Sequence, residues 1–297
     1  MIRIGPAGWS YPDWDGRVYP QHKPAGFHPL ALLAKSFECV EINSTFYALP
    51  RAEHAQRWLE IVREHPRFRF VAKLNRDFTH ITTREAEERA SLLENHAREF
   101  SAGLEPLRQA KRLAALLVQF PTSFLFGKNE VRRLGRLRAL FPDVPLVLEV
   151  RHQSWFVPPA PDTVRGLSYS LAYLDLPAAW NHPPEWHEPT GPVGYLRLHG
   201  RNSEHWFREE SGRDQRYDYL YEPAELEGLA QRARRVRDTH PDTYVITNNH
   251  FGGKAIANAL EIAFLLSGER QHAPAEIVAA FPRLAAVVRP EGQGNLF

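Results

Sequence analysis

The 297-residue sequence has a single cysteine, Cys39, which excludes an intramolecular disulfide. A lone cysteine at the start of an apolar run is more often a buried structural thiol than a nucleophile, and we expect that role here. No stretch approaches the roughly 20 apolar residues of a membrane-spanning helix. The N-terminus lacks a basic segment followed by a long apolar run, so no signal peptide is indicated. We therefore expect a cytoplasmic protein with no membrane partner.

Strong net charge is also absent, because 37 Lys and Arg residues against 35 Asp and Glu residues leave only +2 at pH 7. This balance argues against binding nucleic acid or membranes over the whole surface, but it is compatible with a local basic patch. No Gly-x-Gly-x-x-Gly follows the first expected strand, so the usual signature of dinucleotide binding is missing. His-x-His and His-Glu-x-x-His spacings are missing as well, and these would have supported a metal site.

The sequence does contain a regular alternation of strand-like and helical segments. Expected strands lie at 2–5, 39–47, 68–74, 114–120, within 144–156, 168–175, 194–201 and 243–250. Expected helices lie at 28–37, 53–65, 83–100 (capped by Thr83), 104–112, 129–140, 223–240 and 254–266.

Alternating strands and helices imply a parallel sheet with right-handed crossovers. Eight such units in about 270 residues favour a closed (β/α)8 TIM-type barrel over an open α/β sheet. We expect the barrel domain to span residues 1–288, with an additional C-terminal helix after Pro274. A short flexible tail is expected over 289–297.

The stretch 144–156 reads VPLVLEVRHQSWF and contains an apolar run typical of a strand buried on both faces. The end of that run carries Glu149, Arg151 and His152. Because side chains alternate along a strand, Glu149 and Arg151 are expected on the same face. Charges are rarely buried without a partner or a function, so this strand end indicates a site.

Polar residues stand at most other expected strand ends as well. In a TIM-type barrel, the C-terminal ends of the strands form the active site. The candidates, beside Glu149 and Arg151, are Trp9, Glu41, Asn43, Lys73, Gln119, Asp175, Arg197, His199, Asn248, Asn249 and His250.

Three interpretations of these residues remain open. In the first, carboxylates and imidazoles hold a divalent metal, Zn or Mn, with the ligands drawn from Glu41, Glu149, Asp175, His199 and His250. In the second, cationic side chains bind an anion while Glu149 or His199 transfers protons; the cations are Lys73, Arg151, Arg197 and Arg201. In the third, Glu41, Glu149, Arg151 and Arg197 neutralise one another as a buried network without catalytic function.

The anion interpretation gains support from the loops after the last two strands. Barrel enzymes often bind phosphate there, with the help of a helix N-terminus. Gly200-Arg201 follows the seventh strand, and Gly252 and Gly253 precede the helix after the eighth. Glycines allow backbone N–H groups to converge on an anion, although a simple glycine turn explains them equally well.

Two further segments suggest roles beside the site. The polar segment 202–222 is long for a passive connection, which favours a functional loop or lid. Aromatic side chains near the expected mouth suit stacking on a planar ring, or packing of the rim; they are Trp9, Tyr11, Trp155 and Trp206. The final residues Gln293-Gly294-Asn295-Leu296-Phe297 resemble the Q-x-x-L-F peptides that dock on the bacterial sliding clamp. Gln293, Leu296 and Phe297 match that pattern.

Several motifs together resemble one known family. In chain order they are GWSYPDW, VEINSTFY, QFPTSF, EVRHQSW, YLRLHGR and NNH. They resemble the signature segments of the YecE-like family, a domain of unknown function, from Ile2 to about Leu266. The resemblance implies a TIM-type barrel and no established activity. Its polar motif positions fall on Glu41, Asn43, Lys73, Gln119, Glu149, Arg151, His152, Arg197, His199 and Asn248 to His250.

The leading hypothesis from the sequence is an uncharacterised barrel enzyme that acts on a phosphate-bearing substrate, including nucleic acid, by hydrolysis or lyase chemistry. Glu149, His199 and Glu41 are the candidate catalytic residues. One alternative is a non-catalytic ligand-binding or nucleic-acid-binding protein linked to DNA processing through its tail. A third is a metal-dependent sugar isomerase or an aldolase-like enzyme, which rests on fold analogy alone.

Overall fold

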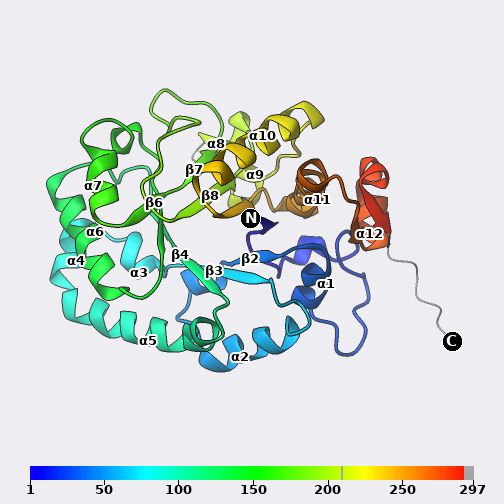
Figure 1. The fold of residues 1–297 in the computed structure, drawn as a ribbon, viewed down its shortest axis with the longest axis horizontal. Helices are drawn as coiled ribbons and strands as arrows, with labels where there is room; N and C mark the ends of the chain where they lie inside the picture. The colour runs from blue at the N-terminus through cyan, green and yellow to red at the C-terminus, as the bar shows by residue number, and fades with distance from the viewer. Residues whose placement is uncertain (209, 291–297) are drawn as a thin grey trace.

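The computed structural model describes residues 1–208 and 210–290. It is a mixed α/β fold in which parallel strands lie in the middle and helices surround them (Figure 1). The tail residues expected to dock on a clamp, Gln293, Leu296 and Phe297, lie outside these ranges.

The strands form two principal sheets, ordered β1-β9-β8-β7 and β2-β3-β4-β5-β6, with a separate pair β10-β11. Every paired strand is parallel to its neighbour. Their bounds are β1 Ile2–Pro6, β2 Cys39–Ile42, β3 Arg69–Lys73, β4 Leu113–Gln119, β5 Leu146–Glu149, β6 Tyr169–Leu171, β7 Tyr173–Asp175, β8 Val193–Leu198, β9 Asp242–Thr247, β10 Gln271–Ala273 and β11 Val288–Pro290.

Helices connect most successive strands and cover the outside of the sheets. Their bounds are α1 Pro29–Ser36, α2 Ala52–Ile61, α3 Arg76–Thr79, α4 Thr83–Glu88, α5 Ala90–Gln109, α6 Lys128–Leu140, α7 Ala160–Gly166, α8 Ser203–Trp206, α9 Arg213–Arg216, α10 Pro223–Thr239, α11 Lys254–Ser267 and α12 Ala275–Ala280. Short 3-10 turns are η1 Pro12–Trp14, η2 Ser44–Phe46, η3 Gln153–Trp155, η4 Phe251–Gly253 and η5 Pro282–Ala286.

The two principal sheets meet at both of their margins. On one side, a parallel bridge joins Ala7 to Glu41, and the Gly8 N–H donates to the Glu41 carbonyl over 2.8 Å. On the other side, the chain passes from β6 to β7 through Ala172, whose N–H donates to the Leu148 carbonyl. The arrangement is therefore barrel-like, and strands from both sheets end around one common region.

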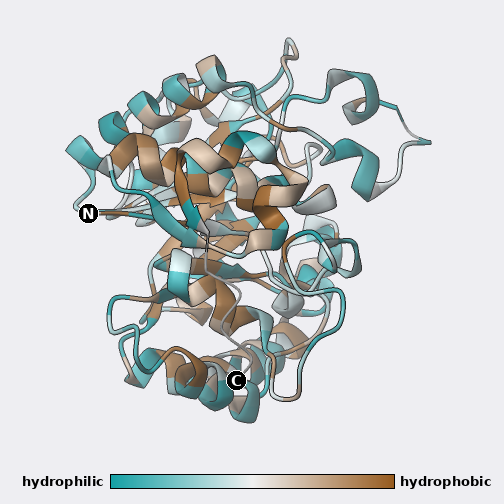
Figure 2. Cartoon of the chain, turned by 90° about the vertical axis from the view of Figure 1, so that its right-hand side faces the viewer, coloured by the Kyte–Doolittle hydropathy of each residue, from teal (hydrophilic) through white to brown (hydrophobic). Residues whose placement is uncertain are grey.

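Two layers of apolar side chains stabilise this arrangement. Within the ring of strands, Cys39, Val71, Leu117 and Val147 pack with their neighbours, so Cys39 is a buried thiol; burial raises its pKa. Between strands and helices, larger clusters follow the apolar faces of α1, α2, α5 and α10. Figure 2 shows hydrophilic residues on the outer sides of the helices, as expected for amphipathic helices packed on a sheet.

Some elements differ from the expectations above. The strand expected over 168–175 divides at Ala172, because β6 pairs with β5 whereas β7 pairs with β8. The cap of α4 is Thr82 rather than Thr83, because Thr82 and Glu85 form a reciprocal capping box. The helices expected over 83–100 and 104–112 are rearranged, since α5 runs unbroken to Gln109 with Pro106 inside it. The pair β10-β11 was not expected, and it extends ordered strand to Pro290, beyond the expected boundary at 288.

Candidate functional site

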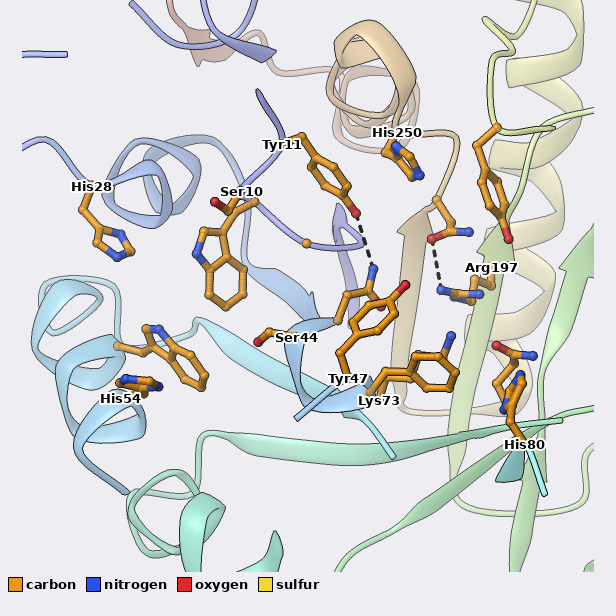
Figure 3. A pocket seen from close by; sticks show the side chains of 18 of the residues that line it. Ser10, Tyr11, His28, Ser44, Tyr47, His54, Lys73, His80, Arg197 and His250 are labelled. Atoms are coloured by element: carbon orange, nitrogen blue, oxygen red, sulfur yellow. Dashed lines mark hydrogen bonds between the residues drawn. The ribbon is translucent and has the colours of Figure 1, made fainter. Parts of the chain in front are cut away.

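A pocket of about 780 Å³ opens at the C-terminal ends of the strands. Figure 3 shows side chains converging on it from the loops after β1, β2 and β3, from α2, and from β8 and the segment after β9. None of the described residues that line it is an Asp or a Glu. The lining includes four cationic side chains, which are Arg57, Lys73, Arg151 and Arg197.

Many of the residues expected from strand ends line this pocket. They are Trp9, Asn43, Lys73, Gln119, Arg151, Arg197, Asn248 and His250. Glu41, Glu149 and His199 are not part of the lining, because each is fully buried beneath it.

Arg197 is the centre of a hydrogen-bonded network under the pocket. Its Nη2 and Nε donate to the two carboxylate oxygens of Glu41 at 2.6 and 2.9 Å. Its Nη1 donates to Glu149 at 3.0 Å, and Nη2 also donates to the Asn248 side-chain oxygen at 3.0 Å. The Tyr195 hydroxyl donates to Glu41 at 2.6 Å. A buried guanidinium is thus matched by two buried carboxylates, which offsets the cost of removing these charges from water.

Glu149 accepts from a second guanidinium at the edge of the pocket. Nε and Nη2 of Arg151 reach its Oε1 at 3.1 and 3.0 Å. Burial alone would raise the pKa of Glu149, but Arg197, His199 and Arg151 hold it well below its usual value. The remaining Nη1 of Arg151 has no hydrogen-bond partner among residues 1–208 and 210–290. Arg151 therefore has both N–H groups of Nη1 available at the pocket, while its Nε and Nη2 anchor Glu149.

His199 completes the buried network. Its Nε2 lies 3.4 Å from Glu149, and its Nδ1 lies 3.1 Å from the Asn248 side-chain nitrogen. Burial lowers the pKa of His199 to about 3 despite the attraction of Glu149. The imidazole is therefore neutral near pH 7. Because it is enclosed and neutral, its position suits holding Asn248 and Glu149 rather than exchanging protons with the pocket.

Lys73 differs from the other cations of the site. It is the last residue of β3, and its backbone carbonyl accepts a 2.6 Å hydrogen bond from the Thr45 hydroxyl. The Nζ atom lies 4.0 Å from the centre of the Phe46 ring and forms neither a hydrogen bond nor an ion pair with any residue in the described part of the chain. Burial, with the repulsion of Arg197, lowers the pKa of Lys73 to about 7. Both the ammonium and the free amine are therefore populated at neutral pH.

Residues 3–283 match the family described as "Protein of unknown function DUF72". The chain belongs to this family. It is 30% identical to the UPF0759 protein YunF of Bacillus subtilis (strain 168) over 290 residues, which is 91% of this chain and 96% of that protein. It is 38% identical to the UPF0759 protein YecE of Escherichia coli (strain K12) over 80 residues, 27% of this chain and 26% of that protein. The resemblance to the YecE-like family is thereby confirmed.

Solved structures of DUF72 proteins have the same fold as this DUF72 member. A family protein from Thermotoga maritima aligns with a TM-score of 0.76 at 32% identity, covering 90% of this chain and 99% of that one. One from Enterococcus faecalis aligns with a TM-score of 0.76 at 27% identity, covering 90% and 95%. These relatives establish family and fold, and they assign no substrate.

Arg201 and Asp175 lie outside the pocket of this DUF72 member. Arg201 donates from Nε and Nη2 to Asp175, at 2.7 Å in its shortest bond, and from Nη1 to Glu225 at 3.0 Å. The Tyr221 hydroxyl donates to Asp175 at 2.6 Å. Arg201 is thus occupied by carboxylates, which leaves it poorly suited to the anion-binding role expected from the sequence.

The glycine loop after β9 is also occupied internally. The Gly252 N–H donates to the Asp13 carboxylate at 2.6 Å, and the Gly253 N–H donates to the His250 carbonyl at 3.2 Å. Asn249 donates to Asn258 and to the Tyr219 carbonyl, away from the pocket. The two glycines adopt positive φ, which explains their presence as a backbone requirement. The expected phosphate loop therefore has no donor left on either glycine.

A metal site receives no support from the geometry. Among the residues that the structure describes, no group of three or more His, Cys, Asp and Glu side chains is placed to hold a metal ion. Asp175 pairs with Arg201 at 2.7 Å rather than with another potential metal ligand. The His250 ring stacks on the Tyr11 ring, with ring centres 4.5 Å apart. Every helix within residues 1–208 and 210–290 is too short or too polar to span a membrane.

One wall of the pocket was not expected from the sequence. His54, Arg57 and Trp58 of α2 line it, and Trp58 packs edge-on against Trp9 at 5.5 Å. These residues are not at a strand end, so an inspection of strand ends misses them. Their spacing of three and four residues places them on one helix face, and that is the signal available in the sequence.

Aromatic side chains from 202–208 and 210–222 form another part of the site. Within these residues, α8 brings Trp206 to 5.7 Å from the Arg151 guanidinium and 5.9 Å from the His199 ring. Tyr217 packs against Trp206 and reaches the pocket. Trp155, in contrast, is buried and stacked on Phe124, so it has a packing role.

Proposed function

We propose that this DUF72 protein is an enzyme that binds a phosphate-bearing substrate in the pocket at the strand ends and acts on it by hydrolysis or lyase chemistry. The observation that carries this proposal is the charge of the pocket lining. Four cationic side chains and no carboxylate line it among the described residues. Glu41 and Glu149 beneath the pocket balance the charges of Arg197 and Arg151, so Lys73 and Arg57 supply the positive charge that remains. That remaining charge attracts anions, because field lines concentrate in a concave, partly desolvated site.

Arg151 and Lys73 are the proposed anion-binding residues. Each has a polar hydrogen that no described residue accepts, on Nη1 of Arg151 and on Nζ of Lys73. Guanidinium groups suit the oxygens of a phosphate because their N–H groups form a planar fork. Arg57, exposed on the rim, adds further positive charge.

Glu41, Glu149 and His199 take supporting roles in this proposal. Glu149 is ionised and fully paired, and His199 is neutral and enclosed, so neither suits proton transfer to a bound substrate. Lys73 is better suited to proton transfer, because a general acid or base works best with a pKa near the working pH. Asn43, Gln119 and Asn248 supply neutral polar contacts around the substrate, and the His250 ring lines the same pocket.

We also propose that the two sheets form one closed (β/α)8 barrel over residues 1–288. The Ala7–Glu41 bridge and the continuous chain from β6 to β7 support closure. Gly5 supports it too, since a Cβ there would overlap the Cys39 carbonyl oxygen at the contact between β1 and β2.

Thermal-shift measurements with paired ligands test the proposal. Ribose 5-phosphate and phosphate monoesters should raise the melting temperature of the wild type, whereas ribose should not. The shift should shrink in Lys73→Met and persist in Lys128→Met, a lysine outside the pocket. Stabilising ligands then enter turnover assays. Equal shifts with phosphorylated and unphosphorylated ligands would contradict the proposal.

A non-catalytic binding protein is the alternative, and turnover separates the two. If stabilising phosphorylated ligands are recovered unchanged and the tail binds the sliding clamp, the binding role is favoured. Clamp pull-down that is unchanged after deletion of residues 293–297 would contradict docking through Gln293, Leu296 and Phe297.

A further inference from the structure

One lysine amine lines the pocket, and its surroundings indicate more than anion binding. The sequence has six lysines, and Lys73 is the one that lines this pocket. Two of the other lysines have carboxylate partners, in the pairs Lys23–Asp15 and Lys254–Asp218. Lys73 has none among the described residues, although two carboxylates lie in the same site.

The arrangement of those carboxylates explains the isolation of Lys73. Glu41 is held by Arg197 and Tyr195, and Glu149 is held by Arg197 and Arg151. The negative charges of Glu41 and Glu149 are therefore balanced by arginines, and neither carboxylate pairs with Lys73. A lysine kept without a partner in a desolvated pocket is the arrangement used for amine nucleophiles that attack carbonyl groups.

We propose that Lys73 forms an imine with a carbonyl group of the substrate, so that the substrate is a phosphate-bearing aldehyde or ketone. This inference rests on the proposed function and specifies its substrate class. In such a substrate the phosphate would lie on Arg151 and Arg57, and the carbonyl of the same molecule would lie beside Nζ. Lys73 would thus contact a simple anion as the ammonium form and the carbonyl of the substrate as the free amine. An iminium withdraws electrons from the neighbouring carbon–carbon bond. Imine formation therefore favours cleavage of that bond, which is a lyase reaction.

The covalent step balances without a cofactor. The Nζ lone pair forms a bond to the carbonyl carbon, the C=O π electrons move to oxygen, and one proton passes from the nitrogen to that oxygen to give a neutral carbinolamine. The nitrogen lone pair then forms the C=N bond while the hydroxyl takes one proton from solvent and leaves as water, which gives the protonated imine (iminium). Free amine is available for the first step at neutral pH, since burial and Arg197 lower the pKa of Lys73 to about 7.

Neighbouring groups suit both ends of this step. The iminium nitrogen carries a positive charge, and the Phe46 ring face 4.0 Å from Nζ stabilises a cation in that position. The side-chain oxygen of Asn43 is buried without a hydrogen-bond partner and lines the same pocket. This oxygen can accept a hydrogen bond from a hydroxyl group such as that of the carbinolamine.

Reductive trapping tests the inference on the full-length wild-type protein. Pyridoxal 5′-phosphate, which carries both an aldehyde and a phosphate, is added at pH 7 with sodium cyanoborohydride, and peptide mass spectrometry locates the adduct. We expect modification at Lys73 at least about tenfold faster than at Lys128, because an amine with a pKa near 7 is far more deprotonated than an ordinary lysine. Lys73→Arg should lose that adduct and keep the others.

Inorganic phosphate separates this inference from the proposed function. If both hold, millimolar phosphate slows trapping at Lys73 and leaves Lys128 unaffected. Trapping at Lys73 without protection supports the imine and contradicts the phosphate site. Phosphate-dependent stabilisation with Lys73 modified no faster than Lys128 overturns the imine and leaves the phosphate site standing. If phosphate has no effect and Lys73 is modified no faster than Lys128, both the imine and the phosphate site are overturned.

Discussion

Arg197 near the end of β8 and Lys73 at the end of β3 are cations in opposite environments. Arg197 is fully buried and bonded to both Glu41 and Glu149. Lys73 is half-buried, with an aromatic ring instead of a carboxylate beside its Nζ. The first arrangement builds a rigid floor, and the second leaves a group whose charge and reactivity are available to a ligand.

Removing Arg197 should destabilise the fold strongly. In Arg197→Met, Glu41 and Glu149 keep their burial and lose their central partner. We expect the free energy of unfolding to fall by about 3–5 kcal/mol, the usual cost of leaving buried charge uncompensated. Denaturant unfolding measures it. Arg165→Met, which removes a surface pair with Asp162, is the control and should change stability by less than about 1 kcal/mol.

His199 should make stability depend on pH. Its pKa is about 3 in the folded state and about 6.5 in the unfolded state, so the unfolded chain binds the extra proton between these values. Stability is therefore complete above pH 6.5 and falls as the pH drops toward 3, by up to about 1.4 kcal/mol per pH unit from this group. His199→Gln should flatten the profile in that window. Equal slopes in variant and wild type would show that His199 is not held neutral.

At the scale of elements, the segment 202–222 shows how a loop contributes to a site formed by strands. Trp206 of α8 lies over Arg151, and Tyr217 reaches the pocket. The lid role expected from its length remains a prediction. What the length alone could not indicate is which side chains face inward, since that depends on the tertiary contact with His199.

Trp206→Ala should loosen this segment. The substitution removes ring contacts to Arg151, His199 and Tyr217, so amide hydrogen exchange within 202–208 and 210–222 should accelerate. Affinity for phosphorylated ligands should weaken, because Arg151 loses one of its supports. Phe207→Ala is the matched control, since that ring is 53% exposed and should leave exchange nearly unchanged. Similar exchange in both variants would contradict a covering role for Trp206.

For the whole molecule, apolar patterning predicted the order of strands and helices well, because the helices bury one apolar face and strands such as β5 and β8 bury both. Strand ends also indicated the residues around Arg197, since parallel strands bring their C-terminal ends together. The strand ends could not predict that Arg201 pairs with Asp175 or that the Gly252 N–H donates to Asp13. Asp175 and Asp13 are far from them in sequence, and only the folded chain brings these carboxylates to them.

The same limit applies to the division of roles within the site. From the sequence, Glu149 and His199 were candidate catalytic residues and Lys73 a candidate anion-binding residue. Burial separates them, because Glu149 and His199 are enclosed by partners whereas Lys73 faces the pocket. A residue's exposure depends on which neighbours cover it, and those neighbours come from several strands.

The central claim, that the pocket binds an anion through Lys73 and Arg151, is tested most directly by calorimetric titration with sulfate at pH 6.5. Sulfate is a dianion at pH 6.5, so a difference in sulfate affinity between variants reflects a change in the protein. We predict one saturable site that phosphate competes for, with affinity about tenfold weaker in Lys73→Met and unchanged in Lys128→Met. Absence of saturable binding, or equal affinity in wild type and Lys73→Met, would contradict the account.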